Sequence, residues 1–167
     1  NLDFPHLMLR YRTAQRKNNE LPKMPYQLSQ LDRNGKIGVL LSSVINWVTN
    51  IKNSFFRKIM ELLTHIDRRV KLPKYNSETF TNFFKNNAKK ISMGKLLDRK
   101  VVIYSTCFVN FNKKNTGVAA LKVLKKNGVE VEHAYPGCCG MPFLEQADLP
   151  KVVEQAQKVS SELLKWI

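Results

Sequence analysis

The cysteines of this chain follow two apolar runs that each predict a buried strand. Residues 101–104 lead to Cys107, and residues 129–134 lead to two adjacent cysteines at 138–139. Residues 117–126, between the two runs, have the apolar spacing of a helix. Two strands joined by a helix pair in parallel through a right-handed crossover, so their C-terminal ends share one edge of the sheet. Open α/β sheets bind ligands at that edge, and the sequence therefore predicts three thiols at one ligand-binding edge.

The order of the elements predicts an α/β fold. Asp148 can cap a last helix after the cysteine pair, which gives the order strand, helix, strand, helix. This is half of a doubly wound parallel sheet, preceded by a mainly helical basic segment over residues 1–99. Two strands rarely form a stable sheet alone, and the chain starts with Asn and stops within an apolar-periodic helix. We therefore interpret it as an internal fragment whose sheet continues beyond residue 167.

The segment before the first strand contains a long helical pattern. From residue 37 to residue 66, apolar side chains recur every three or four positions, which predicts one long amphipathic helix with a break near Asn53 and Ser54. Its apolar face is wider than two strands can cover, so we expect it to be partly exposed here and to dock on another surface. Residues 19–35 contain two prolines and read as an irregular connector.

Three phenylalanines precede the first strand, at 80, 83 and 84. Aromatic side chains among basic residues can stack single-stranded bases. The spacing of three to four residues also fits a short helix with one buried face. We favour the buried face.

The net charge of +15 is unevenly distributed. Residues 1–100 carry 20 Lys and Arg against 7 Asp and Glu, whereas residues 101–167 carry 8 against 6. A basic half can contact an acidic protein, an anionic membrane or nucleic acid. The chain is also rich in both Lys and Asn, as an AT-rich coding sequence would make it. We do not expect nucleic acid to be the partner.

Three cysteines, two of them adjacent, do not make a disulfide framework, and they favour a reducing compartment. Three interpretations stay open from the spacing. Cys107, Cys138 and Cys139 could hold an iron–sulfur cluster. They could instead be three of four zinc ligands, although an adjacent pair is atypical for zinc. They could also be redox-active or merely buried thiols. We favour the cluster.

Other residues near the cysteines would suit an anionic cluster. Gly137 and Gly140 flank the pair and would let backbone N–H groups approach the sulfur atoms. Residues 108–115 read as a loop before a helix that Asn115 or Thr116 caps, and we include its Asn110 and Lys113 in the surroundings of the site.

One histidine lies near the predicted site. His133 could donate a hydrogen bond to the cysteines, but a position on the exposed face of the strand is our preferred interpretation. The sequence contains no Ser/His/Asp constellation, no phosphate-binding loop and no G-x-G-x-x-G fingerprint after either strand.

The stretches 104–112 and 136–142 resemble the cysteine-rich CCG domain of iron–sulfur oxidoreductase subunits. That domain occurs in the heterodisulfide reductase B subunit, the iron–sulfur subunits of glycolate and lactate oxidases, and the C subunit of anaerobic glycerol-3-phosphate dehydrogenase. Its pattern is one Cys, Cys-Cys about thirty residues later, and then Cys-x-x-Cys, which here would fall beyond residue 167. Residues 3–10 and 71–75 resemble the linker that follows a ferredoxin-like domain in some members.

The resemblance implies two regions and a role. Residues 1–99 would be a helical basic linker after a ferredoxin-like domain, and residues 100–167 would be the N-terminal half of a CCG domain. The parent would be a cytoplasmic electron-transfer subunit, at the periphery of the inner membrane, with a [4Fe–4S]-type cluster on Cys107, Cys138 and Cys139. Its partners would be the flavin- or substrate-binding subunits of a redox complex. The fragment alone should not turn over. The alternative is a basic module that binds nucleic acid or an acidic surface.

Overall fold

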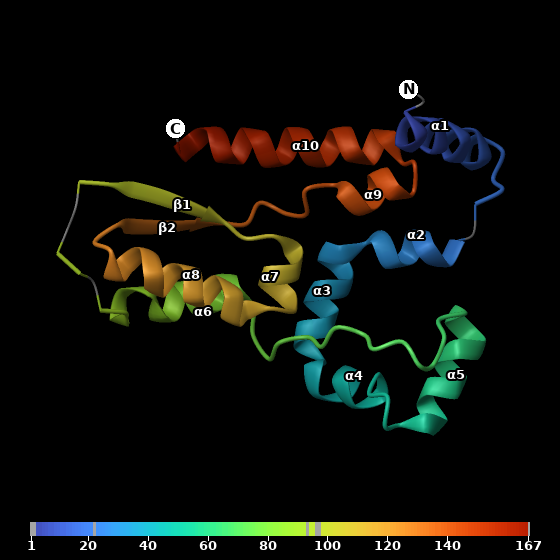
Figure 1. The fold of residues 1–167 in the computed structure, drawn as a ribbon, viewed down its shortest axis with the longest axis horizontal. Coiled ribbons are helices and arrows are strands. Elements are labelled where there is room, and N and C mark those ends of the chain that lie inside the picture. Colours follow the sequence, from blue (N-terminus) through green and yellow to red (C-terminus); the bar gives the residue numbers. More distant parts are fainter. Residues whose placement is uncertain (1–2, 22, 93, 96–97, 167) are drawn as a thin grey trace. The chain divides into compact units, whose positions relative to one another are not determined.

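A computed structural model describes residues 3–21, 23–92, 94–95 and 98–166 of the chain. It is a mixed α/β fold with a two-stranded parallel sheet (Figure 1). The chain divides into two compact units, one formed by residues 1–32 and 136–167 and the other by residues 33–135. The predicted boundary at residue 100 stays a prediction.

The sheet of the second unit has the predicted topology. Strand β1 (Lys100–Tyr104) pairs in parallel with β2 (Glu130–Ala134), in a register that joins the first residues and the last residues of the two strands. The connection contains α7 (Cys107–Phe111) and α8 (Lys114–Lys126). Residues 108–115 were therefore wrongly expected to be a loop, because Thr106 caps a further helical turn. Helix α8 also begins before the predicted caps, at Lys114.

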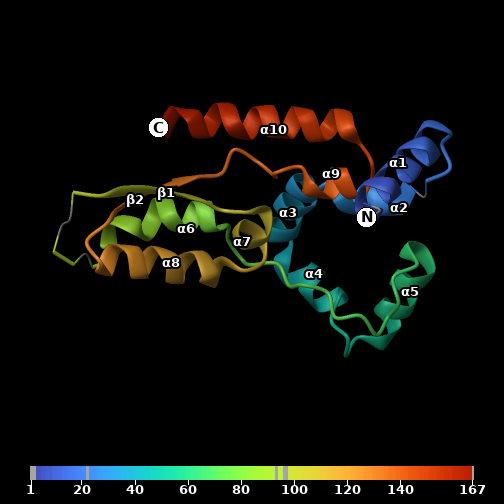
Figure 2. The same cartoon turned by 45° about the horizontal axis from the view of Figure 1, so that its top comes forward.

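Two helices cover one face of this sheet. Helix α6 (Phe80–Asn87), which continues into the short 3-10 helix η1 (Ala88–Lys90), lies beside α8 under the strands (Figure 2). Phe80 and Leu121 are fully buried. Gly117 on α8 allows the close approach, because a Cβ there would lie 2.8 Å from the Phe80 ring. The expected buried face of the phenylalanine helix is confirmed.

The helix predicted over residues 37–66 is divided into three helices, α3 (Leu31–Leu40), α4 (Ser42–Val48) and α5 (Ser54–Thr64). The break at Leu41 was not predicted. The predicted break near Asn53 and Ser54 is confirmed, because α5 begins at Ser54 with Asn53 as its cap residue. Asn50 and Asn53 favour this break because Asn side chains bond to nearby backbone, as Asn50 does with the N–H of Lys52. The connector expected at 19–35 is also largely helical, with α2 (Lys23–Ser29) and the start of α3.

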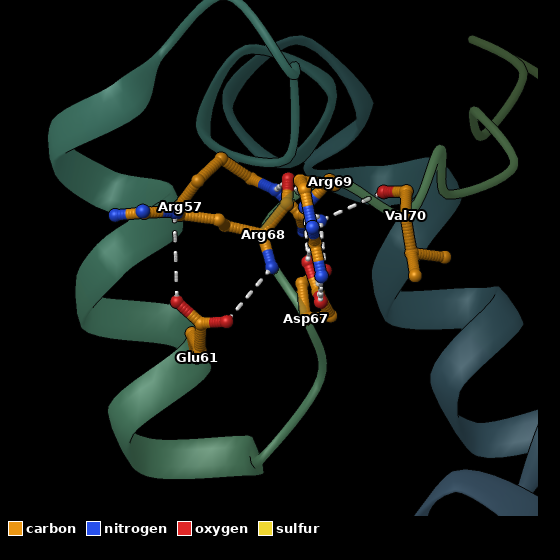
Figure 3. A network of polar contacts seen from close by, with 6 residues as sticks. All are labelled: Arg57, Glu61, Asp67, Arg68, Arg69 and Val70. Carbon is orange, nitrogen blue, oxygen red and sulfur yellow. Dashed lines mark hydrogen bonds and ion pairs between the residues drawn. The ribbon is translucent and has the colours of Figure 1, made fainter.

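A buried arginine fixes the chain that follows α5. Arg57 is 1% exposed, and its guanidinium donates to the backbone carbonyls of Asp67, Arg68 and Val70 (Figure 3). Around it, Glu61 accepts the N–H of Arg68, and the Asp67 carboxylate pairs with Arg69 at 2.6 Å. One cation therefore satisfies several carbonyls that have no strand or helix partner.

The apolar stripe of the three helices is exposed, as predicted. Phe55 and Leu63 are each 68% exposed, Ile59 is exposed, and Phe56 is half-buried. Phe56 packs between rings, 5.1 Å from Trp47 and 5.4 Å from Phe55 by centroid distance. No helix in the described residues is both long enough and apolar enough to cross a membrane.

The first unit contains four α-helices among its described residues: α1 (Phe4–Lys17), α2, α9 (Met141–Glu145) and α10 (Leu149–Leu163), the last followed by the 3-10 helix η2 (Leu164–Trp166). Arg16 joins them, because its guanidinium pairs with Asp148 at 2.8 Å and stacks over the ring of Tyr26. Asp148 also caps α10, as the sequence predicted.

Candidate metal centre

Cys107 is the first residue of α7 and lies three positions after Tyr104, the last residue of β1. Thr106 caps this helix by accepting the N–H of Val109, and the Cys107 side chain is half-buried. The N–H of Ser105 donates to the carbonyl of Ala134, so the strand pairing extends one residue beyond β1. Cys107 therefore follows the last residue of the paired backbone, Ser105, by two positions, and this pairing fixes where Cys107 lies.

His133 fixes the same turn from the second strand. Its Nε2 lies 2.8 Å from Oγ of the buried Ser105. Its ring stands against the rings of Phe80 and Phe84, with centroids 5.1 and 5.3 Å away. Burial, with a smaller effect from the charge of Lys85, lowers the pKa of His133 to about 4. The exposed position expected for His133 is wrong, because α6 covers that face of the strand.

Asn110 and Lys113 have different surroundings from each other. Asn110 is buried, and its Oδ1 accepts both the N–H and the hydroxyl of Thr81 at 3.0 Å, which ties α7 to the start of α6. Lys113 is exposed just before α8. Asn110 thus holds the helix that begins with Cys107, and a role for either residue beside a cluster stays a prediction.

The cysteine pair lies in the first unit, in a turn bounded by two glycines with unusual backbone angles. Gly137 has φ of +148° and Gly140 has φ of +93°, a left-handed conformation that favours glycine. The carbonyl of Gly140 accepts the N–H groups of Phe143 and Leu144, which starts α9. Cys138 is 2% exposed and Cys139 is exposed, so the two thiols have opposite surroundings.

Sequence reasoning missed Asp32, whose Oδ2 accepts the backbone N–H of Cys138 at 2.9 Å. The two residues are 106 positions apart. Because Asp32 lies in a stretch that was read as an irregular connector, no local pattern singled it out.

The structure confirms the pairing of the strand ends that precede the cysteines. Tyr104 pairs with Ala134, and Cys107 and Cys138 follow these residues by short connections. All three cysteines are outside disulfides. In the described residues, no three side chains of His, Cys, Asp or Glu are grouped as a metal site. The convergence of the three sulfur atoms stays a prediction.

The donor chemistry fits an iron–sulfur cluster. The residues offered are thiols, which are the usual ligands of such clusters. The glycines at 137 and 140 remove side chains from both ends of the cysteine pair. A Cβ on Gly140 would lie 3.3 Å from Cβ of Gln155, closer than an ordinary contact, and the φ of +93° would strain any residue other than glycine there.

The sequence is similar to known proteins over most of its length. The family model of the CCG cysteine-rich domain matches residues 101–165. The C subunit of anaerobic glycerol-3-phosphate dehydrogenase from Escherichia coli K12 is 29% identical over 132 residues, which are 78% of this chain and 32% of that protein. The same protein from Escherichia coli O157:H7 aligns equally.

The chain thus spans about a third of the length of the curated relatives it matches. No solved structure matches it significantly. The matched segment contains Cys107, Cys138, Cys139 and both strands of the sheet. Residues 101–165 of this chain are therefore similar to the CCG family of cysteine-rich domains.

Proposed function

We propose that this chain is part of an iron–sulfur electron-transfer subunit of an oxidoreductase. Cys107, Cys138 and Cys139 would hold a [4Fe–4S]-type cluster. Such a cluster commonly has four thiolate ligands, so at least one further ligand would not be a cysteine of this chain. The observation that carries the proposal is the position of the cysteines, which follow the paired C-terminal ends of two parallel strands in a CCG domain. Ligand sites of open α/β sheets lie at such edges.

The residues around the cysteines would have different roles in this proposal. A bound cluster would supply one-electron transfer. Buried Cys138 would keep water from one side of the site, because its side chain is almost fully covered. Exposed Cys139 would lie where a redox partner can approach. The hydrogen bonds of Ser105 and Asn110 would hold the turn and helix around Cys107.

Chemical analysis of the full-length protein tests the proposal. Purified without oxygen, it should contain iron and acid-labile sulfide and show broad visible absorption. Cys138→Ser and Cys139→Ser should each lower the iron content, because a hydroxyl is a poorer ligand than a thiolate for such clusters. Ser161→Ala, a change on the exposed side of α10, is the control and should leave the iron content unchanged. Stoichiometric zinc without sulfide would refute the cluster.

We further propose that the exposed apolar face of α3–α5 docks on another subunit of a redox complex. Leu62 is 78% exposed, and the basic flank is formed by exposed residues before, within and after α5, namely Lys52, Lys58, Arg68 and Arg69. Large exposed apolar surfaces usually mark contacts, and the flank would face acidic residues. The relative that matches this chain is named as a dehydrogenase subunit, which supports a protein partner. We propose that the complex lies in the cytoplasm, at the periphery of the inner membrane.

Co-purification distinguishes this docking from the alternatives. Leu62→Asp should release the partner subunits, whereas Val123→Asp, at an apolar position on α8 that is 61% exposed, should not. Binding to anionic vesicles that is lost in Leu62→Asp would show a membrane contact instead. Binding to nucleic acid with a steep salt dependence would favour the basic-module alternative.

A further inference from the structure

The carboxylate of Asp32 lies at the turn that carries the cysteine pair. Its Oδ2 accepts the backbone N–H of Cys138 at 2.9 Å, and both residues belong to the first compact unit. Asp32 is outside the segment that matches the CCG family model. Asp32 therefore connects the helical region before the CCG segment to Cys138, a candidate ligand, through one hydrogen bond.

Other polar groups surround the residue before Cys138. A Cβ on Gly137 would lie 3.2 Å from Oδ2 of Asp32, 3.5 Å from Oε1 of Gln155 and 3.6 Å from Nζ of Lys158. Oε1 of Gln155 is buried and has no hydrogen-bond partner in the described residues. The turn is therefore packed into a polar environment that contains one negative and one positive side chain.

We infer that Asp32 positions the Cys138 turn through its hydrogen bond and lowers the reduction potential of the group that the cysteines hold. This inference rests on the proposed cluster. Reduction adds one electron, and therefore one negative charge, to that group. A nearby carboxylate raises the energy of the more negative state, and local charge and hydrogen bonding are known determinants of cluster potentials.

The positive charge of Lys158 should have the opposite effect on the reduction potential. Its ammonium stabilises the reduced state, so its loss lowers the potential. Because the Lys158 side chain is exposed, solvent screens its charge more strongly and its effect is the smaller of the two. A purely structural role for Asp32 predicts no such pair of opposite shifts.

Redox titration of the full-length protein tests whether the charge of Asp32 lowers the reduction potential. Dithionite supplies the electron, and the midpoint potential is read from the visible and electron paramagnetic resonance spectra. Asp32→Asn keeps an oxygen that accepts the Cys138 N–H but removes the charge, so the potential should rise. Lys158→Gln should lower it by less. Glu162→Gln is the matched control on α10, because it removes one exposed carboxylate that pairs with Lys165, and the potential should not change.

Hydrogen exchange tests whether Asp32 holds the Cys138 turn, and this test does not require a bound cluster. In protein freed of metal, the peptide over residues 136–143 should exchange its amide hydrogens faster in Asp32→Ala than in wild type. Asp32→Asn should restore slow exchange, since its amide oxygen can accept the same N–H. The Glu162→Gln protein should exchange as wild type does.

The outcomes separate this inference from the proposed function. A cluster whose potential is the same in Asp32→Asn and Glu162→Gln overturns the electrostatic role. Equal exchange in wild type and Asp32→Ala overturns the positioning role. Absence of iron and sulfide in the wild-type protein refutes the proposed function, and the exchange comparison then still decides whether Asp32 holds the cysteine turn.

Discussion

Oγ of Ser105 lies 2.8 Å from Nε2 of His133, and this contact joins the turn before Cys107 to the second strand of the sheet. The imidazole is held on its other sides by Phe80 and Phe84 of α6. A helix that precedes the matched CCG segment thus helps to fix the backbone on which the first cysteine stands.

Ser105→Ala should destabilise the second unit. The change leaves the half-buried His133 ring without its hydroxyl partner, and an unsatisfied buried polar group costs about 1–3 kcal/mol. The free energy of unfolding from urea titration measures the effect. Ser161→Ala, on the exposed side of α10, is the control and should change stability by less than about 0.5 kcal/mol. Equal losses in the two variants would contradict a special role for the Ser105 contact.

The stability of the second unit should fall as the pH is lowered from about 6.5 towards 4. Burial lowers the pKa of His133 to about 4 in the folded state, whereas an unfolded histidine titrates near its ordinary value. Between these values the unfolded chain binds a proton that the folded chain does not, so unfolding becomes easier as pH falls. The partial exposure of the ring limits the effect to about 1 kcal/mol.

His133→Gln gives the matched control for this pH dependence. Glutamine does not titrate, so the difference in unfolding free energy between wild type and variant should shrink by that amount between pH 7 and pH 4.5. Parallel curves for the two proteins over this range would mean that His133 titrates normally in the folded state.

Arg57→Leu should be the most destabilising of these changes. The carbonyls of Arg68 and Val70 would lose the buried guanidinium as donor, and the Asp67 carbonyl would keep only the N–H of Val70. We expect a loss of about 2–4 kcal/mol in the free energy of unfolding. Arg69→Leu removes an exposed ion pair with Asp67 and should cost far less, because solvent screens such a pair. A reversed order would show that the Arg57 contacts do not fix the chain after α5.

Gly140→Ala should disturb the cysteine turn. Alanine is strained at φ of +93°, and its Cβ would lie 3.3 Å from Cβ of Gln155. The combined cost is on the order of 1–3 kcal/mol. In the full-length protein, reduced iron content relative to wild type would accompany this loss if the turn holds a ligand. Unchanged stability and iron content would show that the turn adapts without cost.

The parallel pairing of β1 and β2, the helix between them and the cap at Asp148 could be predicted because each depends on local pattern. Apolar runs, helical spacing and capping side chains act between neighbours in sequence. The handedness of a crossover then places the two strand ends together regardless of the rest of the chain. The cysteines follow those strand ends, and so the matched CCG segment was also recognisable from sequence.

Other features depend on residues that only folding brings together. The burial of Arg57 among carbonyls and the cover of His133 by α6 each result from contacts with other segments. Asp32 reaches Cys138 across 106 positions. Periodicity carries no information about such partners, because burial, pKa and hydrogen bonding depend on distances in space, which the packing of the helices decides.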